Sequence, residues 1–299
     1  MGVRVGFGLP VAGAWATPAN VARFAARAEE LGYGSLWTFQ RLIVGENEQV
    51  LPVYRAVLDP LIALSFAAAH TSTARLGVAI VNAPFVSPTV LAKQAGTLDL
   101  LSGGRLDLGL GTGWSPAEFV ATGASMERRG RRVEEYAAVL RTLWADEVSS
   151  FDGEFYAVPA ARMDPKPVQR PGPPLLFGGS VPAALRRAGR LGDGWISRSA
   201  QDLSAIAADV AEVRRGAVEA GKDPAAVRIV CRGVVRPGER GPRLSGSPDD
   251  IRADLAWLAD QGVTEVFLDL NWDPLIGNPA TDPDEATTRA DTLLTALAP

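Results

Sequence analysis

The sequence of 299 residues contains one cysteine, Cys231, and one histidine, His70. A single cysteine excludes a disulfide within the chain, so we expect a protein of the reducing cytoplasm. A single histidine excludes a multi-histidine metal centre. Ser-His-Asp or Cys-His catalysis would have to use His70, the one histidine present. His70 ends an alanine-rich stretch typical of a helix C-terminus, where we expect a structural role. Cys231 lies in the strand-like "RIVCRGVV", which favours a buried small apolar residue.

Excess basic charge and long apolar runs are also absent. The net charge is −4 and the pI about 5.3, which argues against nucleic-acid binding. No apolar run reaches the roughly 18 residues that cross a bilayer. The opening "MGVRVGFGLPVAG" has too short an apolar part for a secretory signal and predicts a first strand. We therefore expect a cytoplasmic protein with neither a nucleic-acid nor a membrane partner.

Short apolar runs with β-branched residues alternate with longer helical patterns along the whole chain. Strands are expected at 3–9, 35–39, 75–83, 105–111, 175–179 and 193–197, and in the segments "VRIVCRGVV" and "TEVFLDL". Helical patterns follow these strands, so the alternation predicts a parallel sheet. Eight such units in about 300 residues fit the α/β class and a closed (βα)8 TIM barrel, with one domain over residues 1–299. A Rossmann-type sheet would need a strand order that the sequence does not reveal.

Three segments exceed a minimal barrel and are expected as insertions. Residues 147–158 predict a hairpin that turns at Asp152-Gly153. The loops 40–57 and 271–286 are long. Barrel enzymes keep their function in loops at the C-terminal ends of the strands, so we expect substrate specificity in the two long loops.

The stretch "GGRLDLGLGTGWSP", residues 103–116, carries alternating glycines at the end of the fourth strand. A dinucleotide-binding fingerprint is excluded, because its third glycine would fall on Trp114 and because it should follow the first strand. Glycines here would let a flat ligand approach the backbone, and the alternative is that they serve packing and turns. Ser115 and Glu118 have the spacing of a helix capping box.

A second glycine run, "LLFGGSVPAALRRAGRLGDGW", ends a strand at Gly178-Gly179-Ser180 and passes directly into a helix. Exposed amides at a helix N-terminus and a serine hydroxyl can bind a phosphate. The alternative is an ordinary N-cap by Ser180. A G-x-S-x-G nucleophile elbow is excluded, since Pro182 stands at its last position. Two glycine-rich strand ends together indicate a large, flat ligand that bears a phosphate.

These motifs carry a resemblance to a known family. The segment "LDPLIALSFAAAHTSTARLGVAIVNAPFVSPTVLAKQAGTLDLLSGGRLDLGLGTGWSPAEFVATG" resembles the bacterial luciferase-like oxidoreductases, as do "PKPVQRPGPPLLFGGS" and "RLGDGW". The resemblance runs over roughly residues 3–270 in order. "SLWTFQRL" and "RLGVAI" look most like the branch that uses the deazaflavin coenzyme F420. The resemblance implies a (βα)8 barrel with insertions, a homodimer, and a deazaflavin or flavin across the C-terminal mouth.

The resemblance also assigns cofactor contacts. It implies a bulged, non-prolyl cis peptide between Ala79 and Ile80 beneath the ring, with Asn82 close by. The ring and tail would be bordered by Gly111, Thr112, Gly113 and Trp114, and the phosphate would meet Gly179 and Ser180. Trp114 stands where some relatives hold an acidic catalytic residue, and here we expect it to form a pocket wall.

Gln40 and Arg41 are the candidate catalytic residues, at a place where related deazaflavin enzymes often have an Asp-His pair. A Gln-Arg pair does not readily trade protons, because arginine stays charged. Gln40 could instead hydrogen-bond the ring, and Arg41 could hold a substrate carboxylate or stabilise a developing enolate.

Three functions remain open at this point. The first is hydride transfer between coenzyme F420 and a small organic substrate, which suits a chain poor in acid–base groups of the triad kind. The second is an FMN-dependent monooxygenase that uses reduced flavin and O2. The third is a flavin- or deazaflavin-binding barrel without catalysis. No metal is expected, and the sequence does not identify the substrate.

Overall fold

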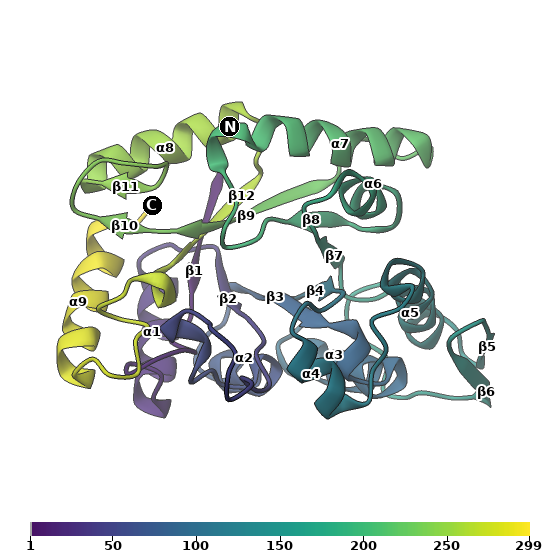
Figure 1. Ribbon diagram of the computed structural model, residues 1–299. Coiled ribbons are helices and arrows are strands. Elements are labelled where there is room, and N and C mark those ends of the chain that lie inside the picture. Colours follow the sequence, from purple (N-terminus) through teal and green to yellow (C-terminus); the bar gives the residue numbers. More distant parts are fainter. Residues whose placement is uncertain (1) are drawn as a thin grey trace.

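The computed structural model describes residues 2–299, so Met1, the first residue of the predicted domain, lies outside the described residues. Eight parallel strands close into a barrel in the order β1-β12-β9-β8-β7-β4-β3-β2 (Figure 1). They are β1 (Arg4–Gly8), β2 (Ser35–Thr38), β3 (Arg75–Asn82), β4 (Leu106–Gly111), β7 (Leu175–Gly178), β8 (Gly194–Ile196), β9 (Arg228–Val234) and β12 (Glu265–Asp269). The predicted α/β (βα)8 TIM barrel is confirmed.

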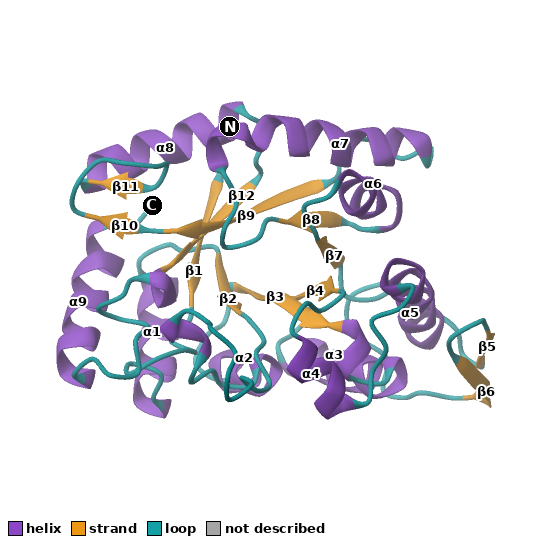
Figure 2. Ribbon diagram, viewed as in Figure 1, coloured by secondary structure: helices purple, strands orange, loops and turns teal. Residues whose placement is uncertain are grey.

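Helices surround the strands on the outside of the barrel (Figure 2). They are α1 (Pro18–Glu30), α2 (Pro60–Ala68), α3 (Pro88–Leu101), α4 (Pro116–Thr122), α5 (Arg129–Ala145), α6 (Pro182–Leu191), α7 (Ile206–Glu219), α8 (Pro248–Asp260) and α9 (Pro283–Ala296). Most of them begin with proline. Proline lacks a backbone N–H, and it fits the first helical position because an N–H there would have no partner within the helix. At α1 the Thr17 hydroxyl accepts the Asn20 N–H at 3.2 Å, so the predicted cap is confirmed.

The predicted capping box between Ser115 and Glu118 is wrong. Ser115 stands at the N-cap of α4 but makes no side-chain cap, because both side chains are engaged by the loop after β2. A capping box occurs instead at α8, where Ser247 and Asp250 bond each other's backbone N–H groups.

The insertions lie outside the barrel wall. The predicted hairpin is present as the antiparallel pair β5 (Ser149–Asp152) and β6 (Ala157–Ala161), which projects beyond α5 (Figure 1). Its turn spans residues 153–156 instead of centring on Asp152-Gly153, because Asp152 still pairs with Ala157. A second small pair, β10 (Arg236–Pro237) and β11 (Ser245–Gly246), follows β9 and was not predicted. Among residues 2–299 no helix is both long and apolar enough to cross a membrane.

Large side chains fill the barrel interior. Trp37 of β2 stacks on Phe267 of β12, with ring centroids 5.0 Å apart. Leu176, Ile196 and Val230 complete this inner cluster from neighbouring strands. The barrel is therefore a packed core and not a pore, and a ligand has room only beyond the strand ends.

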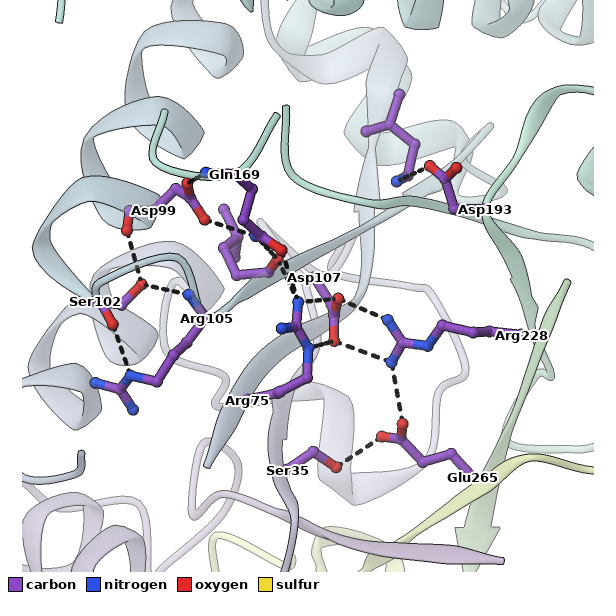
Figure 3. A network of polar contacts seen from close by, with 12 residues as sticks. Ser35, Arg75, Asp99, Ser102, Arg105, Asp107, Gln169, Asp193, Arg228 and Glu265 are labelled. Atoms are coloured by element: carbon purple, nitrogen blue, oxygen red, sulfur yellow. Dashed lines mark hydrogen bonds and ion pairs between the residues drawn. The ribbon is translucent and has the colours of Figure 1, made fainter. Parts of the chain in front are cut away.

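A polar network closes the N-terminal end of the barrel (Figure 3). Buried Asp107 of β4 accepts hydrogen bonds from Arg75 of β3 at 2.6 and 2.8 Å and from Arg228 of β9 at 2.7 and 3.0 Å. Arg228 also donates to Glu265 of β12 at 3.0 Å, and Glu265 accepts from Ser35 of β2 at 2.7 Å. The network thus joins five strands at the face where barrels place residues for stability.

Opposing influences set the charge of Asp107. Burial by itself raises the pKa of this carboxyl, but hydrogen bonds from Arg75 and the charge of Arg228 outweigh burial and hold the pKa below its ordinary value. Asp107 is therefore an ionised, fully buried carboxylate between two arginines.

Candidate active site

A cavity of about 220 Å³ opens at the C-terminal ends of the strands. Nine predicted site residues line it: Gln40, Ala79, Ile80, Asn82, Gly111, Thr112, Gly113, Trp114 and Gly179. Two others, Arg41 and Ser180, are not among its lining residues. Phe39, Tyr54, Gly178, Ile196, Ser197, Arg198, Ser199 and Arg232 complete the wall. Residues far apart in the sequence are thus brought together where barrel enzymes hold their ligands.

The end of β3 forms one side of the cavity. The Ala79-Ile80 peptide is cis, and the register of β3 against β4 shifts between Val78 and Val81. Just beyond it, the Asn82 N–H donates to Gln40 Oε1 at 2.8 Å, and Asn82 Oδ1 accepts the Gly113 N–H at 3.0 Å. The bulged cis peptide expected from the resemblance is present, and Asn82 ties it to the loops after β2 and β4.

The glycines of β4 make room for a neighbouring strand. A Cβ on Gly109 would lie 2.2 Å from the Val78 carbonyl oxygen, and one on Gly111 would lie 2.0 Å from Ile80 Cδ1. Gly109 therefore serves packing, which was one of the two explanations open for the glycine run. Gly111 lines the cavity and also leaves room for Ile80 beside it. Gly113 has a φ of +73°, which side-chain-bearing residues rarely adopt, and lets the chain turn toward α4.

Gly179 and Ser180, the predicted phosphate contacts, lie at the end of β7. Gly179 lines the cavity, and its carbonyl accepts the Trp195 indole N–H at 2.8 Å. Ser180 is exposed, and the N-cap of α6 is Val181, so an N-cap by Ser180 is wrong. Ser180 and the first turn of α6 are therefore accessible to an anion from solvent, and phosphate binding stays a prediction.

Arg41 lies beside the cavity and not in its wall. Its buried guanidinium pairs with Glu48 at 2.8 Å and with Glu118 at 3.6 Å. It also lies over the rings of Trp114 and Tyr54, at 4.6 and 5.4 Å from their centroids. Two carboxylates of the chain already lie beside this arginine, and its grip on a substrate carboxylate or on a developing enolate stays a prediction.

Arg41 and Glu118 instead fasten the loop after β2 to α4. Glu118 accepts the Leu42 N–H at 2.7 Å, and Ser115 donates its hydroxyl to Glu48 at 3.2 Å. The hydrogen bond from Arg41 is the main cause that lowers the pKa of Glu48, which keeps this carboxylate ionised. The cluster holds Trp114 and Tyr54 as a wall at the cavity mouth.

Arg232 of β9 is the buried cation that does face the cavity, and the sequence analysis missed it. Its Nε donates to Asp269 Oδ2 at 2.7 Å, and its guanidinium carbon lies 4.5 Å from the ring centroid of Phe39 and 5.1 Å from that of Trp272. The sequence does carry a signal for Arg232. Side chains alternate between the two faces of a strand, so Arg232, two positions after Val230, lies on the same interior face as Val230.

The single histidine and cysteine lie outside the cavity wall. His70 is exposed just after α2, where its backbone N–H donates to the Ala67 carbonyl at 3.0 Å and its ring lies edge-on to Phe66 with centroids 4.9 Å apart; a structural role for the imidazole stays a prediction. Cys231 is buried, which confirms that prediction. Among residues 2–299, no group of three or more His, Cys, Asp or Glu side chains could hold a metal ion.

Cys231 is expected to be inert in the native protein. Burial raises the pKa of its thiol to about 12, so the reactive thiolate is scarce at neutral pH. An aromatic disulfide reagent should label no thiol in the folded protein and one thiol per chain in urea, as followed by absorbance. Rapid labelling of the native protein would contradict this assignment.

A closed parallel barrel with a glycine-lined cavity at its C-terminal mouth defines a TIM-barrel enzyme. The model of one family, the luciferase-like monooxygenases, matches residues 4–241. The chain therefore belongs to the luciferase-like monooxygenase family, whose members are oxidoreductases and monooxygenases.

Curated relatives divide between two coenzymes. An uncharacterized protein of Mycobacterium tuberculosis is 33% identical over 217 residues, 72% of this chain and 68% of that protein. The FMNH2-dependent dimethylsulfone monooxygenase of Pseudomonas putida is 35% identical over 51% of this chain and 42% of its own length. The F420-dependent glucose-6-phosphate dehydrogenase of Amycolatopsis mediterranei is 28% identical over 62% and 55%.

Solved structures agree on the fold. The monooxygenase RslO1 of Streptomyces bottropensis superposes with a TM-score of 0.80 at 24% identity and covers 99% of this chain and 98% of its own. An F420-dependent secondary alcohol dehydrogenase superposes with a TM-score of 0.78 at 18% identity and covers 99% of both chains. At these identities the likeness concerns the architecture alone.

Proposed function

We propose that this protein is an oxidoreductase that transfers a hydride between coenzyme F420 and a small organic substrate. The observation that carries the proposal is the chemistry of the cavity wall. In the described part of the chain its ionisable residues are Tyr54, Arg198 and Arg232, and none of these types ordinarily titrates near neutral pH. Hydride transfer asks the protein for orientation and exclusion of water more than for proton exchange.

The cavity residues fit such a coenzyme. The bulged end of β3, with Ile80, and the adjacent Gly111 line the cavity, and a tricyclic ring would pack against them. Gln40 offers its amide nitrogen as a donor, since Asn82 already bonds its oxygen. Bound there, the deazaflavin would supply the carbon that gives or takes the hydride. Trp114 would shield one edge of the site from water.

The relative from Amycolatopsis and the F420-dependent alcohol dehydrogenase structure support this coenzyme. The second candidate is an FMN-dependent monooxygenase, which the 35% identity to the Pseudomonas enzyme favours. Both candidates place a planar ring in the same cavity and differ in whether O2 is a substrate. A non-catalytic coenzyme carrier is the third candidate.

Separate titrations of the purified protein with oxidised coenzyme F420 and with FMN test the proposal. Trp114 lines the cavity, so a bound ring should quench its fluorescence, and Trp114→Phe should show a smaller change. Quenching at micromolar concentrations by coenzyme F420 alone supports the proposal, and reduction of enones or imines by the reduced coenzyme then separates enzyme from carrier. Binding of FMN alone, with oxygen uptake, supports the monooxygenase. Binding of neither overturns both.

We extend the proposal to a homodimer, which the family resemblance implies. On α2, Ile62 is 72% exposed and Phe66 is 43% exposed, and on α3 Leu101 is 72% exposed. Ile62 and Leu98 also line a groove of about 400 Å³ between these helices. Apolar side chains grouped along two neighbouring helices suit the surface of a second copy of the chain.

Ile62→Asp is expected to convert the dimer to a monomer, because it places a charge in the apolar contact. Light scattering after size-exclusion chromatography measures the mass. Val120→Asp on α4, where Val120 is 83% exposed, is the matched control and should stay dimeric. A wild-type monomer would refute the dimer, and a dimeric Ile62→Asp would refute this interface.

A further inference from the structure

Two cavities meet at Arg232. The ring cavity described above has this side chain in its wall. A second cavity, of about 520 Å³, lies under the loops after β8 and β9, and its wall contains Arg232 and Ser199 as well. Its remaining lining comes from residues 200–204 and from Val234, Arg236, Pro242 and Arg243. Arg232 therefore stands at the boundary between the place for a planar ring and adjoining space that no cofactor prediction uses.

The guanidinium of Arg232 is held in place but not saturated. Its exposed fraction is 7%, so water contributes little to its solvation. Asp269 accepts from Nε and pairs with Nη2, each at 2.7 Å, yet Nη2 makes no well-directed hydrogen bond. Nη1 has a long contact of 3.5 Å to the Ala79 carbonyl, at the cis peptide. Buried donors without partners are costly, so these donors would stabilise an oxygen atom of a ligand at the boundary between the two cavities.

The surroundings fix the direction of these free donors. Asp269 is itself anchored, since its Oδ1 accepts from the Asn271 side chain at 2.8 Å and its Oδ2 accepts from the Trp272 indole at 3.1 Å. Phe39 and Trp272 lie within cation–π distance of the guanidinium. A guanidinium held in this way is a preorganised donor, which is the arrangement that stabilises charge developing on an oxygen.

We propose that the second cavity binds the substrate, and that Arg232 binds the oxygen of its reacting carbonyl group. The substrate class is thereby a small aldehyde, ketone or enone. Arg232 has one carboxylate partner, Asp269, and keeps further N–H donors, so it can bind a neutral carbonyl oxygen and stabilise the negative charge that this oxygen gains during reaction. This inference rests on the proposed function, since it concerns the molecule that exchanges a hydride beside the ring.

The step balances without a protein-borne acid. In an aldehyde or ketone the hydride would add to the carbonyl carbon while the π-electron pair of the C=O bond moves to oxygen, which gives an alkoxide. In an enone such as 2-cyclohexenone it would add to the β carbon, the C=C pair would shift toward the carbonyl carbon and the C=O π pair would move to oxygen, which gives an enolate. In both cases the substrate is reduced by two electrons and the deazaflavin is oxidised. Arg232 donates hydrogen bonds to the resulting alkoxide or enolate oxygen and gives up no proton. Water then supplies the proton, to the oxygen of the alkoxide or to the α carbon of the enolate.

Benzoate is the binding probe, since its carboxylate mimics the oxyanion and is not reduced. Isothermal titration of the purified protein, with and without coenzyme F420, should show benzoate binding that weakens at least tenfold in Arg232→Gln. With reduced coenzyme F420 and 2-cyclohexenone, kcat/KM should fall about a hundredfold, as for loss of an oxyanion donor, while the coenzyme Kd changes less than threefold. Arg252→Gln, an exposed arginine on α8, is the control for charge loss and should match wild type.

Arg232→Lys separates a ligand role from a structural one. It retains the positive charge beside Asp269 and should restore thermal stability, but it lacks the planar fork and should bind benzoate weakly. Wild-type affinity for benzoate in Arg232→Gln or Arg232→Lys overturns the proposal. So does a wild-type protein that binds no benzoate, or loss of binding in Arg236→Gln alone. If neither coenzyme binds, the proposed function fails, while the titration without coenzyme still decides the role of Arg232.

Discussion

Asp107→Asn is expected to lower the free energy of unfolding by about 3–5 kcal/mol, as removal of one partner from a buried ion pair does. The substitution leaves Arg75 and Arg228 facing each other around a neutral amide that also brings donors of its own. Urea denaturation followed by circular dichroism measures the change. Asp249→Asn is the control, because its pair with Arg252 is exposed and should contribute less than about 1 kcal/mol. A loss below 1 kcal/mol for Asp107→Asn would contradict a role for the network in stability.

The same carboxylate predicts a pH dependence. Its folded pKa is lowered, so its stabilising contribution is present above the unfolded pKa of about 3.9 and is lost as the pH falls through the folded value. The stability difference between wild type and Asp107→Asn should therefore stay constant from pH 7 down to about 5 and shrink at lower pH. Urea unfolding of both proteins across this range gives the difference. A difference that grows on acidification would contradict an ionised Asp107.

The barrel could be predicted because its signals are local. Period-2 and helical patterns alternate through the chain, and prolines such as Pro18 and Pro88 mark the starts of helices in sequence. Residues at the strand ends then meet at one rim of the barrel. The family resemblance picked out Gln40, Asn82 and Trp114 among them, and all three line one cavity.

The direction of individual side chains could not be predicted, because it depends on partners distant in sequence. Arg41 turns away from the cavity because Glu48 and Glu118 hold it from two different segments. The capping box predicted from the spacing of Ser115 and Glu118 is wrong for the same reason. The Leu42 N–H, in the loop after β2, takes the Glu118 carboxylate as its acceptor. Arg232 was overlooked because its role comes from Asp269, on another strand.

Gly111 links the packing of β4 to the coenzyme cavity. A substitution there is therefore expected to weaken coenzyme binding strongly. Gly111 has no positive φ, so alanine suits its backbone, but the new Cβ would lie 2.0 Å from Ile80 Cδ1. Ile80 is the flexible partner and also lines the cavity, so it should turn into the space of the ring. Overpacking of this kind costs about 1–3 kcal/mol. We expect Gly111→Ala to weaken binding of coenzyme F420 by a factor of roughly 30, since each 1.4 kcal/mol is tenfold.

Shortening Ile80 provides the matched test, because Ile80→Val removes the Cδ1 atom that the new methyl group would strike. The double variant Gly111→Ala/Ile80→Val should recover most of the lost affinity, while Ile80→Val alone should bind within about threefold of wild type. Fluorescence titration of the four proteins forms a double-mutant cycle with a coupling energy of about 1–2 kcal/mol, the range for residues in contact. Additive losses would show that Gly111 contacts the ring directly, as its sequence pattern first suggested. Strong coupling would show that it acts through Ile80, so that packing between β3 and β4 sets the shape of the cavity.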